Sequence, residues 1–140
     1  RLYFKKTHMN EILALGRSKV EVNIETLMML DSLDMKEEDR ELIVAACTAI
    51  NEDQIVITHG TDTMTKTAKA LGGNNLKKTI VLTGAMIPFK FGTSDGLFNI
   101  ASALAYVQTM PHGVYIAMNG RVFNYDKVIK NRGTGIFEEK

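Results

Sequence analysis

The sequence predicts a doubly wound α/β fold, that is, a mainly parallel sheet with helices on both faces. Three short apolar runs have the β-branched content and the continuity of strands buried on both sides, and they are residues 54–58, 79–83 and 114–118. Two segments with helical periodicity lie between them. The order strand, helix, strand, helix, strand implies right-handed crossovers, and ligands of such folds bind beyond the carboxyl ends of the strands.

The segment before these strands is predicted to hold two helices and one further strand. Residues 6–16 have the spacing of a short helix that ends at a glycine. Val20, Val22 and Ile24 alternate with polar residues, which predicts a strand with one polar face. Residues 34–37 carry a helix-capping signature. The apolar positions of the helix that follows are Leu42, Ala45, Ala46 and Ala49.

The two crossover helices are predicted from their apolar spacing and their end signals. The first has Met64, Ala68 and Leu71 on one face and ends at a Gly-Gly pair. The second begins after a cap at Ser94 or Asp95. Its apolar positions are Leu97, Ile100, Ala101 and Leu104.

Composition favours one domain, residues 1–140, and disfavours several classes of function. Seventeen basic against sixteen acidic residues leave a net charge of +1, so a nucleic-acid partner is not expected. No run approaches the roughly 18 uninterrupted apolar residues of a membrane span. The single cysteine, Cys47, and histidines without companions at ligand spacing predict no metal site. No cofactor is expected either.

Polar residues gather directly after the predicted strands. They lie in residues 58–64 and 84–88, and Asn119-Gly120 follows the third strand. Thr61 and Asp62 stand before a helix, whose free N–H groups favour an anionic ligand such as a carboxylate. Both residue types are also preferred helix caps, so capping alone could explain them. A single cap does not require a loop this rich in polar groups.

Two blocks of sequence resemble the amino-terminal domain of the bacterial-type L-asparaginases. The first is His-Gly-Thr-Asp-Thr-Met at residues 59–64. The second covers residues 80–88 and is followed by Ser-Asp-Gly at 94–96 and Phe-Asn at 98–99. The resemblance runs from about Leu30 to Lys130. Residues 30–35 resemble the substrate-contact turn of that family, in the Asp-Ser form of its cytoplasmic members. Residues 126–131 resemble the segment that carries the family's catalytic lysine, which falls on Lys130.

The resemblance implies an amidohydrolase that converts L-asparagine to L-aspartate and ammonia through a threonine nucleophile. It assigns catalytic roles to Thr61, Asp62 and Lys130. The implied substrate contacts are Ser32, Leu33, Gly60, Thr61, Asp62 and Ala85. In the family a second threonine comes from a Gly-Gly-Thr turn near the amino terminus, which this sequence does not contain. We therefore expect the first strand, the nucleophile turn and the lid to lie upstream of residue 1.

Amide hydrolysis needs a nucleophile, a group that takes its proton and donors for the oxyanion. The carboxylate of Asp62 favours the charged form of a neighbouring ammonium, so Lys130 is expected to relay protons and stabilise charge more than to act as a free base. The backbone N–H groups near Thr61 and Ala85 are candidate oxyanion donors. Their direction does not follow from the sequence.

Alternative functions stay open on the sequence alone. One is the amidase domain of a tRNA-dependent amidotransferase, and another is a non-catalytic module that binds an amino acid or a nucleotide. The sequence has no Gly-x-Gly-x-x-Gly or Gly-Lys-Ser/Thr loop, which disfavours a nucleotide. A catalytically inactive relative is a third alternative. The expected substrate is L-asparagine, and L-glutamine stays open as a second substrate. The protein is expected to be a homodimer or a homotetramer and to work in the cytoplasm.

Overall fold

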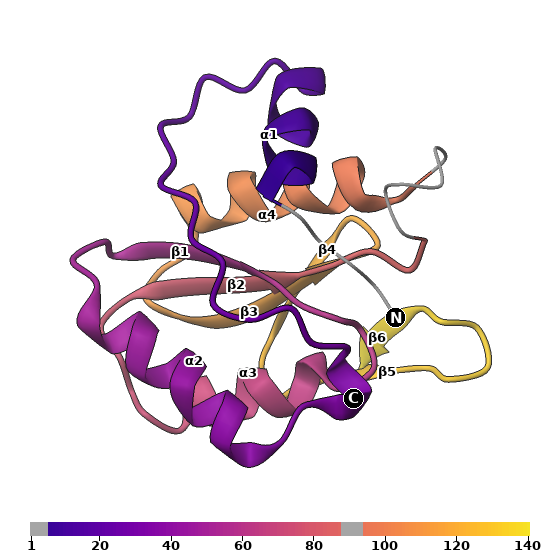
Figure 1. The fold of residues 1–140 in the computed structure, drawn as a ribbon. Helices are drawn as coiled ribbons and strands as arrows, with labels where there is room; N and C mark the ends of the chain where they lie inside the picture. Colours follow the sequence, from indigo (N-terminus) through magenta and orange to yellow (C-terminus); the bar gives the residue numbers. More distant parts are fainter. Residues whose placement is uncertain (1–5, 88–93) are drawn as a thin grey trace.

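A four-stranded sheet forms the centre of the computed structural model, which describes residues 6–87 and 94–140 (Figure 1). The strands lie in the order β1-β2-β3-β4; the first three are parallel and the fourth is antiparallel to its neighbour. The parallel strands are β1 (Gln54–Thr58), β2 (Thr79–Thr83) and β3 (Gly113–Met118), and β4 (Arg121–Asn124) follows a tight turn. The three predicted strands are confirmed.

Helices cover both faces of this sheet, which confirms the predicted fold class (Figure 1). On one face α4 packs on the strands and α1 packs on α4. On the other face α3 packs on the strands and α2 packs on α3. The bounds are α1 (Lys6–Leu15), α2 (Glu37–Ala49), α3 (Met64–Gly72) and α4 (Gly96–Thr109).

Strand β2 lies in the middle of the sheet, and all five of its residues are buried. Its side chains alternate between the two cores: Ile80 and Leu82 belong to the core beneath α2 and α3, while Val81 belongs to the core beneath α4. A strand covered on both faces must be apolar throughout, which explains why this run shows no alternation in the sequence.

The start and the buried face of α2 differ from the prediction. The helix begins two residues later than the capping signature, where the backbone N–H of Lys36 donates to the carboxylate of Asp39 over 2.9 Å. Asp34 instead ends a short 3-10 helix, η1 (Ser32–Asp34). The buried positions of α2 are Arg40, Ile43 and Cys47, and Leu42 is exposed. The predicted face of Leu42 and three alanines is therefore wrong, because α2 packs on α3 and the core through the side that carries Ile43, Val44 and Cys47.

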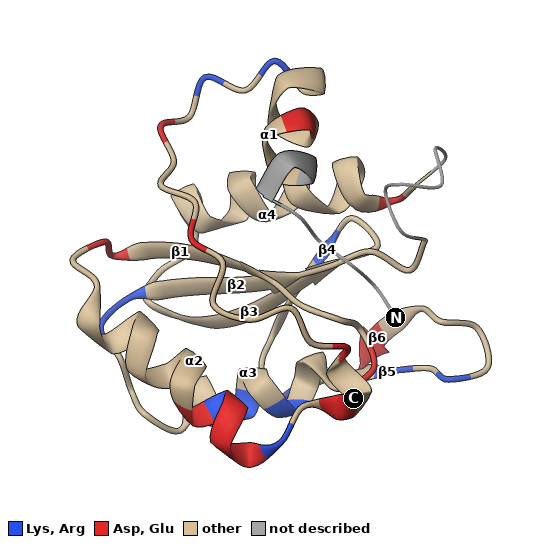
Figure 2. Cartoon of the chain, in the orientation of Figure 1, with Lys and Arg blue, Asp and Glu red and all other residues tan. Residues whose placement is uncertain are grey.

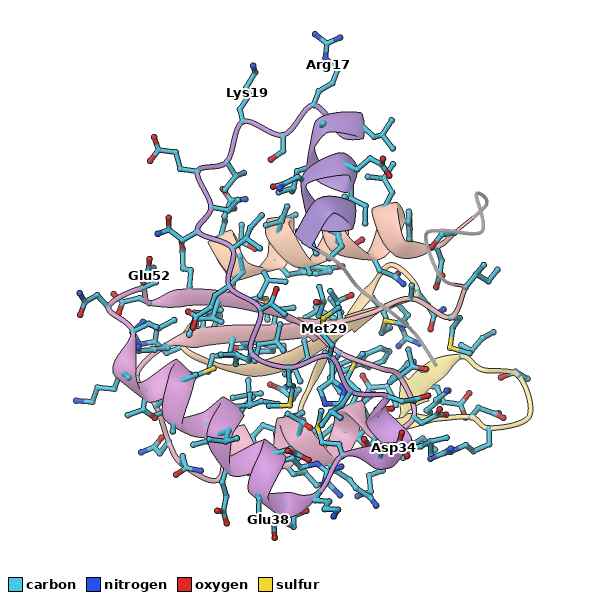
Figure 3. The ribbon with its side chains drawn as sticks, in the orientation of Figure 1. Arg17, Lys19, Met29, Asp34, Glu38 and Glu52 are labelled. Carbon is cyan, nitrogen blue, oxygen red and sulfur yellow. The ribbon has the colours of Figure 1, made fainter. Side chains whose placement is uncertain are left out.

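The strand predicted for residues 20–24 is also wrong, since this segment has no regular secondary structure. Val20 and Val22 are exposed. The side-chain amide of Asn23 donates to the carboxylate of Glu52 over 2.8 Å, so the segment is attached by a side chain instead of a strand ladder. Figure 3 shows Arg17 and Lys19 pointing away from the body of the molecule at the start of this segment. Alternation alone cannot supply the neighbouring strand that a sheet requires.

A second, two-stranded sheet carries Lys130 to the carboxyl end of the main sheet. It pairs β5 (Val128–Lys130) with β6 (Phe137–Glu139), so that Lys130 lies opposite Phe137. The backbone N–H of Phe137 donates to the side-chain oxygen of Asn119 over 2.9 Å. Asn119 belongs to the turn after β3, so this bond fixes the small sheet beside the ends of the parallel strands.

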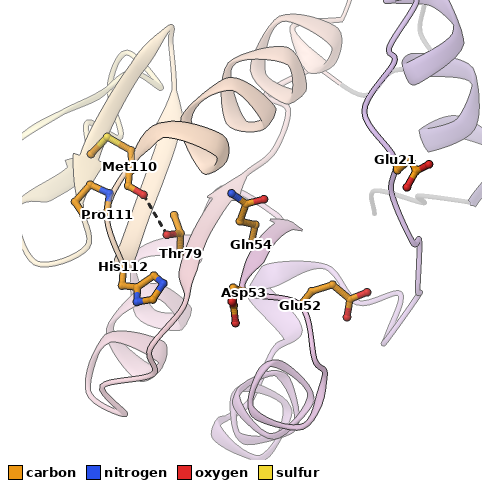
Figure 4. A pocket seen from close by; sticks show the side chains of 8 residues that line it. All are labelled: Glu21, Glu52, Asp53, Gln54, Thr79, Met110, Pro111 and His112. Carbon is orange, nitrogen blue, oxygen red and sulfur yellow. Dashed lines mark hydrogen bonds between the residues drawn. The ribbon is translucent and has the colours of Figure 1, made fainter.

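Charged residues of both signs are spread over the chain, and acidic residues gather at the start of α2 (Figure 2). In the described part of the chain, no helix has the length and apolar character needed to cross a membrane. A hollow of about 790 Å³ lies at the amino ends of the strands, where Thr79 and Gln54 begin β2 and β1 (Figure 4). It is at the opposite edge of the sheet from Thr61.

The carboxyl end of α2 supplies a test of the packing. The ammonium of Lys78 donates to the carbonyl oxygens of Cys47 and Ile50, over 2.8 and 2.5 Å, which would otherwise lack helical partners. We predict that Lys78→Met lowers the free energy of unfolding by about 1 kcal/mol, measured by urea denaturation. Lys77→Met, at the exposed neighbouring position, should change it by less than about 0.5 kcal/mol. Equal losses in the two variants would contradict this role.

Candidate active site

The loop between β1 and α3 holds most of the predicted site residues. It runs from His59 to Thr63, and its neighbour is the turn at Ser32. A Cβ atom on Gly60 would come within 2.8 Å of the Ser32 side chain, so only glycine permits this approach. The loop is therefore pressed against η1 and held at the carboxyl end of β1.

Lys130 joins Thr61 and Asp62, although it lies 69 and 68 residues from them in the sequence. Its ammonium donates to the Thr61 hydroxyl oxygen over 2.8 Å and to the Asp62 carboxylate over 3.0 Å. The Lys130 side chain is only 10% exposed. A cation so far removed from water requires such acceptors, so the three groups form one unit.

Capping does not explain Thr61 and Asp62. The residue at the cap position of α3 is Thr63, and its side chain makes no cap hydrogen bond. Thr61 is 8% exposed, and its hydroxyl group lies between Lys130 and Met86. The capping interpretation of the two residues is wrong.

Arg132 is part of the site, and the sequence analysis missed it. One guanidinium nitrogen lies 3.3 Å from the Asp62 carboxylate, and the other donates to the Asp62 carbonyl oxygen over 2.9 Å. The turn that carries Arg132 is ordered by the side-chain oxygen of Asn131, which accepts from the N–H groups of Gly133 and Thr134. An arginine two residues after a candidate catalytic lysine is the signal that could have identified it.

The loop after β2 approaches Thr61 through Met86. The Thr61 hydroxyl donates to the Met86 sulfur over 3.3 Å. The Asp95 carboxylate accepts from the backbone N–H groups of Met86 and Ile87, over 3.1 and 3.0 Å. A methionine in a sequence indicates only apolar character, so nothing pointed to this contact. Pro88, the last residue of the quoted motif, lies outside the described residues.

Asn99 and Ser94 attach this same loop to the start of α4. The Asn99 side-chain amide donates to the Gly84 carbonyl over 2.8 Å, and the Ser94 hydroxyl donates to the Ile87 carbonyl. Gly84 and Ile87 are thus both attached to residues at or just before the start of α4. Ala85 lies between these attachments and is buried.

Ser32 and Leu33, the other predicted substrate contacts, lie in different environments. Ser32 is 1% exposed; its hydroxyl accepts from the Thr63 N–H over 3.3 Å, and its carbonyl accepts from the Thr63 hydroxyl over 2.8 Å. Leu33 is 65% exposed. In this structure Ser32 anchors the start of α3, and its role toward a substrate stays a prediction.

Two backbone N–H groups of the site are free to bind a ligand. Among the residues that the structure describes, those of Thr61 and Ala85 donate to no protein acceptor. An anionic oxygen placed between them could accept both hydrogen bonds. Within residues 6–87 and 94–140, no three His, Cys, Asp or Glu side chains are placed to hold a metal ion.

Two buried titratable groups have shifted pKa values: His59 in the Thr61 loop, and Cys47 near the end of α2, away from the site. Burial lowers the pKa of His59, the bond to the Gly60 carbonyl opposes this decrease, and the guanidinium of Arg40 adds to it. Burial also raises the pKa of the Cys47 thiol, although Lys78 opposes the increase. A thiol in that state is a poor nucleophile, and Cys47 lies in the core beneath α2 and α3.

Fold and site together define a parallel α/β domain with a threonine, a lysine and an aspartate joined at the carboxyl edge of the sheet. A sequence model of one family, described as "Asparaginase, N-terminal", matches residues 3–136. The chain belongs to the asparaginase family and corresponds to its N-terminal domain.

Individual relatives agree with this assignment. L-asparaginase 1 of Escherichia coli (strain K12) is 36% identical over 112 residues, which are 76% of this chain and 33% of that protein. The thermostable L-asparaginase from Thermococcus kodakarensis has a TM-score of 0.87 at 28% identity, over 96% of this chain and 43% of that chain. A probable cytoplasmic L-asparaginase from Campylobacter jejuni has a TM-score of 0.81 at 28% identity, over 94% and 44% of the two chains. This chain spans about a third of the length of the curated relatives it matches.

His59 makes stability depend on pH in a defined direction. Because its pKa is lower in the folded chain than the value of about 6.5 expected in the unfolded chain, the unfolded state binds the proton more readily. The free energy of unfolding should rise with pH from the lowered pKa up to about 6.5, and this part of the stability is lost below that window. Urea denaturation at several pH values measures the change.

Two variants isolate the contribution of this histidine. His59→Asn removes the titrating group. The free energy of unfolding should then change less between about pH 5 and 7, and the difference from the parent should be on the order of one titrating group's contribution. His112→Gln, at an exposed position, should leave the dependence as it is in the parent. An unchanged slope in His59→Asn would show that other groups cause it.

Proposed function

We propose that this domain takes part in the hydrolysis of the side-chain amide of L-asparagine, which yields L-aspartate and ammonia. The observation that carries the proposal is the contact of the Lys130 ammonium with both the Thr61 hydroxyl and the Asp62 carboxylate. A hydroxyl, an amine and a carboxylate in series can move a proton between an attacking hydroxyl and a leaving nitrogen. Membership of the asparaginase family supports the same reaction.

In this mechanism the attacking group is the hydroxyl of the family's other threonine, the one in the Gly-Gly-Thr turn that this sequence does not contain. That hydroxyl attacks the amide carbon and forms a tetrahedral intermediate. The proton of the attacking hydroxyl passes along Thr61 and Lys130 and reaches the nitrogen, which leaves as ammonia. Asp62 holds the Lys130 side chain in place between these transfers, through a contact of 3.0 Å. Water then hydrolyses the acyl-enzyme and releases the carboxylate, so that one water is consumed for each amide.

The free N–H groups of Thr61 and Ala85 are the proposed donors for the oxyanion of that intermediate. The proposed contacts for the α-carboxylate and α-ammonium of the substrate are Ser32, Leu33, Gly60 and Asp62. Asp62 accepts from Lys130 and Arg132 through one carboxylate oxygen, and the other oxygen has no partner among the described residues. That second oxygen is the one that we assign to the α-ammonium.

We also propose a homo-oligomer, a dimer or a tetramer, that works in the cytoplasm. Several large apolar side chains are exposed, among them Leu33 in η1, Ile87 after β2, Phe98 in the first turn of α4 and Ile136 before β6. A second copy of the chain could cover them. The relative from Campylobacter jejuni is a probable cytoplasmic L-asparaginase, which supports the cytoplasm as the compartment of this protein. Light scattering coupled to gel filtration should give a multiple of the chain mass, and a monomer at all concentrations would contradict the proposal.

Thr61→Val and Lys130→Met test the catalytic assignment. Each keeps most of the side-chain volume and removes the hydroxyl or the ammonium. We expect kcat for L-asparagine, measured by ammonia release in the full protein, to fall at least about 100-fold in each variant. Glutamine in the same assay tests the second substrate.

Matched controls separate chemistry from folding. Thr61→Ser keeps a hydroxyl and should retain measurable turnover, while Thr48→Val and Lys127→Met change exposed positions away from the site and should keep kcat within about twofold. If Thr61→Val and Lys130→Met both hydrolyse asparagine at nearly the parent rate, the proposed mechanism is wrong. If the parent protein hydrolyses neither asparagine nor glutamine, the proposed activity is wrong.

A further inference from the structure

The His59 side chain connects the Thr61 loop to the buried side of α3. It is 5% exposed, and each ring nitrogen has one close partner. Nδ1 lies 2.6 Å from the carbonyl oxygen of Gly60, and Nε2 lies 2.7 Å from the hydroxyl oxygen of Thr67. Thr67, on α3, is fully buried. The mechanism proposed above does not use this histidine.

The partners of the ring define its tautomer. A carbonyl oxygen can only accept, so Nδ1 must carry a proton and donate it to Gly60. Burial and the nearby guanidinium of Arg40 keep the ring neutral, as the lowered pKa of His59 indicates. In a neutral ring Nε2 must then accept, and the Thr67 hydroxyl is its donor. The hydroxyl oxygen lies 2.7 Å from Nε2 and 3.6 Å from the Met35 sulfur, which is the weaker acceptor for the same proton. The Thr67 hydroxyl therefore donates to the ring, and the ring donates to the Gly60 carbonyl.

The Gly60 carbonyl belongs to the same peptide unit as the Thr61 N–H. No peptide bond among the described residues is cis, so the C=O and N–H of this unit point in opposite directions. Holding the carbonyl against His59 therefore turns the Thr61 N–H away from the buried layer. That N–H donates to no described acceptor. Glycine at position 60 lowers the cost of a peptide flip, so this orientation needs a specific contact to hold it.

We propose that His59 is a positioning residue that fixes the Gly60–Thr61 peptide unit, with the Thr61 N–H directed toward the substrate oxyanion. This inference rests on the proposed amidohydrolase function. A flipped peptide would present the Gly60 carbonyl oxygen to the site in place of a donor, and would repel the developing negative charge. His59 takes no proton from the substrate in this role. Its effect reaches the reaction only through the direction of one backbone amide.

A purely structural role for His59 makes a different prediction. If the ring only filled space and satisfied Thr67, any side chain of similar size and polarity that preserved folding would preserve kcat. If the donor at Nδ1 is what matters, activity depends on where the replacement places its N–H. Asparagine and glutamine provide this contrast, because the asparagine amide nitrogen can occupy the place of Nδ1, whereas that of glutamine reaches the place of Nε2.

The experiment compares His59→Asn with His59→Gln in the full protein. For asparagine hydrolysis we expect His59→Asn to keep kcat within about threefold, and His59→Gln to lower it by roughly 10- to 1,000-fold, up to the loss seen when one oxyanion donor is removed. KM should change much less than kcat, because the oxyanion forms only in the transition state. Equal kcat values in the two variants, with both folded by circular dichroism, would overturn the proposal.

A spectroscopic measurement decides the same point without any variant and without activity. A long-range proton–nitrogen correlation spectrum of the imidazoles in the parent protein should show His59 as the neutral tautomer protonated at Nδ1. The tautomer protonated at Nε2 has no donor for the Gly60 carbonyl and would overturn the proposal even in an active enzyme. Failure of the proposed function is a separate outcome: absent asparagine hydrolysis together with the Nδ1 tautomer would retain the peptide orientation and remove its role in catalysis.

Discussion

The buried ammonium of Lys130 is the interaction on which the carboxyl edge of the sheet depends. A charge with so little access to water is tolerated only where acceptors replace its hydration, and here the acceptors are the Thr61 hydroxyl and the Asp62 carboxylate. Three separate segments must therefore meet: the loop after β1, the β5–β6 sheet and, through Met86, the loop after β2. Removing the ammonium would leave Asp62 with only the exposed guanidinium of Arg132.

Close backbone approaches let these segments meet. Gly60 touches Ser32, and a Cβ on Gly84 would collide with the carbonyl oxygen of His59. The loops after β1 and β2 are thus stacked without side chains between them, and the strands beneath are in register from Thr58 opposite Thr83. Side chains of the two loops can therefore come within hydrogen-bond distance of each other, as the contact between the Thr61 hydroxyl and the Met86 sulfur shows.

Sequence reasoning succeeded where one strong local signal was enough. The run at 79–83 is apolar because both of its faces are covered, so its composition identified it as a buried strand. The run at 54–58 was identified by the same composition, although it is the first strand of the four and only its middle residues are half-buried. Sequence reasoning failed where a tertiary partner decides: residues 20–24 alternate but have no strand beside them, and the burial of Ile43 in place of Leu42 depends on how α2 lies on α3. The pairing of Lys130 with Thr61 was expected from resemblance alone. Arg132 contacts Asp62 from a turn that Asn131 orders locally, but its partner lies 70 residues away in the sequence and depends on the tertiary fold.

Thr61 is constrained from two directions, and the constraints act on different atoms. Its hydroxyl is held by Lys130 of β5 and by Met86 of the loop after β2. The direction of its backbone N–H is set through Gly60 by His59, whose ring is bonded to Thr67 on α3. Gly60 allows close packing on Ser32, but it also leaves the Gly60–Thr61 peptide free to rotate. The glycine therefore requires a second residue, His59, to hold that peptide in one orientation. This explains why the loop carries more polar residues than a helix cap needs: each one fixes a different group of the same residue or of its neighbour.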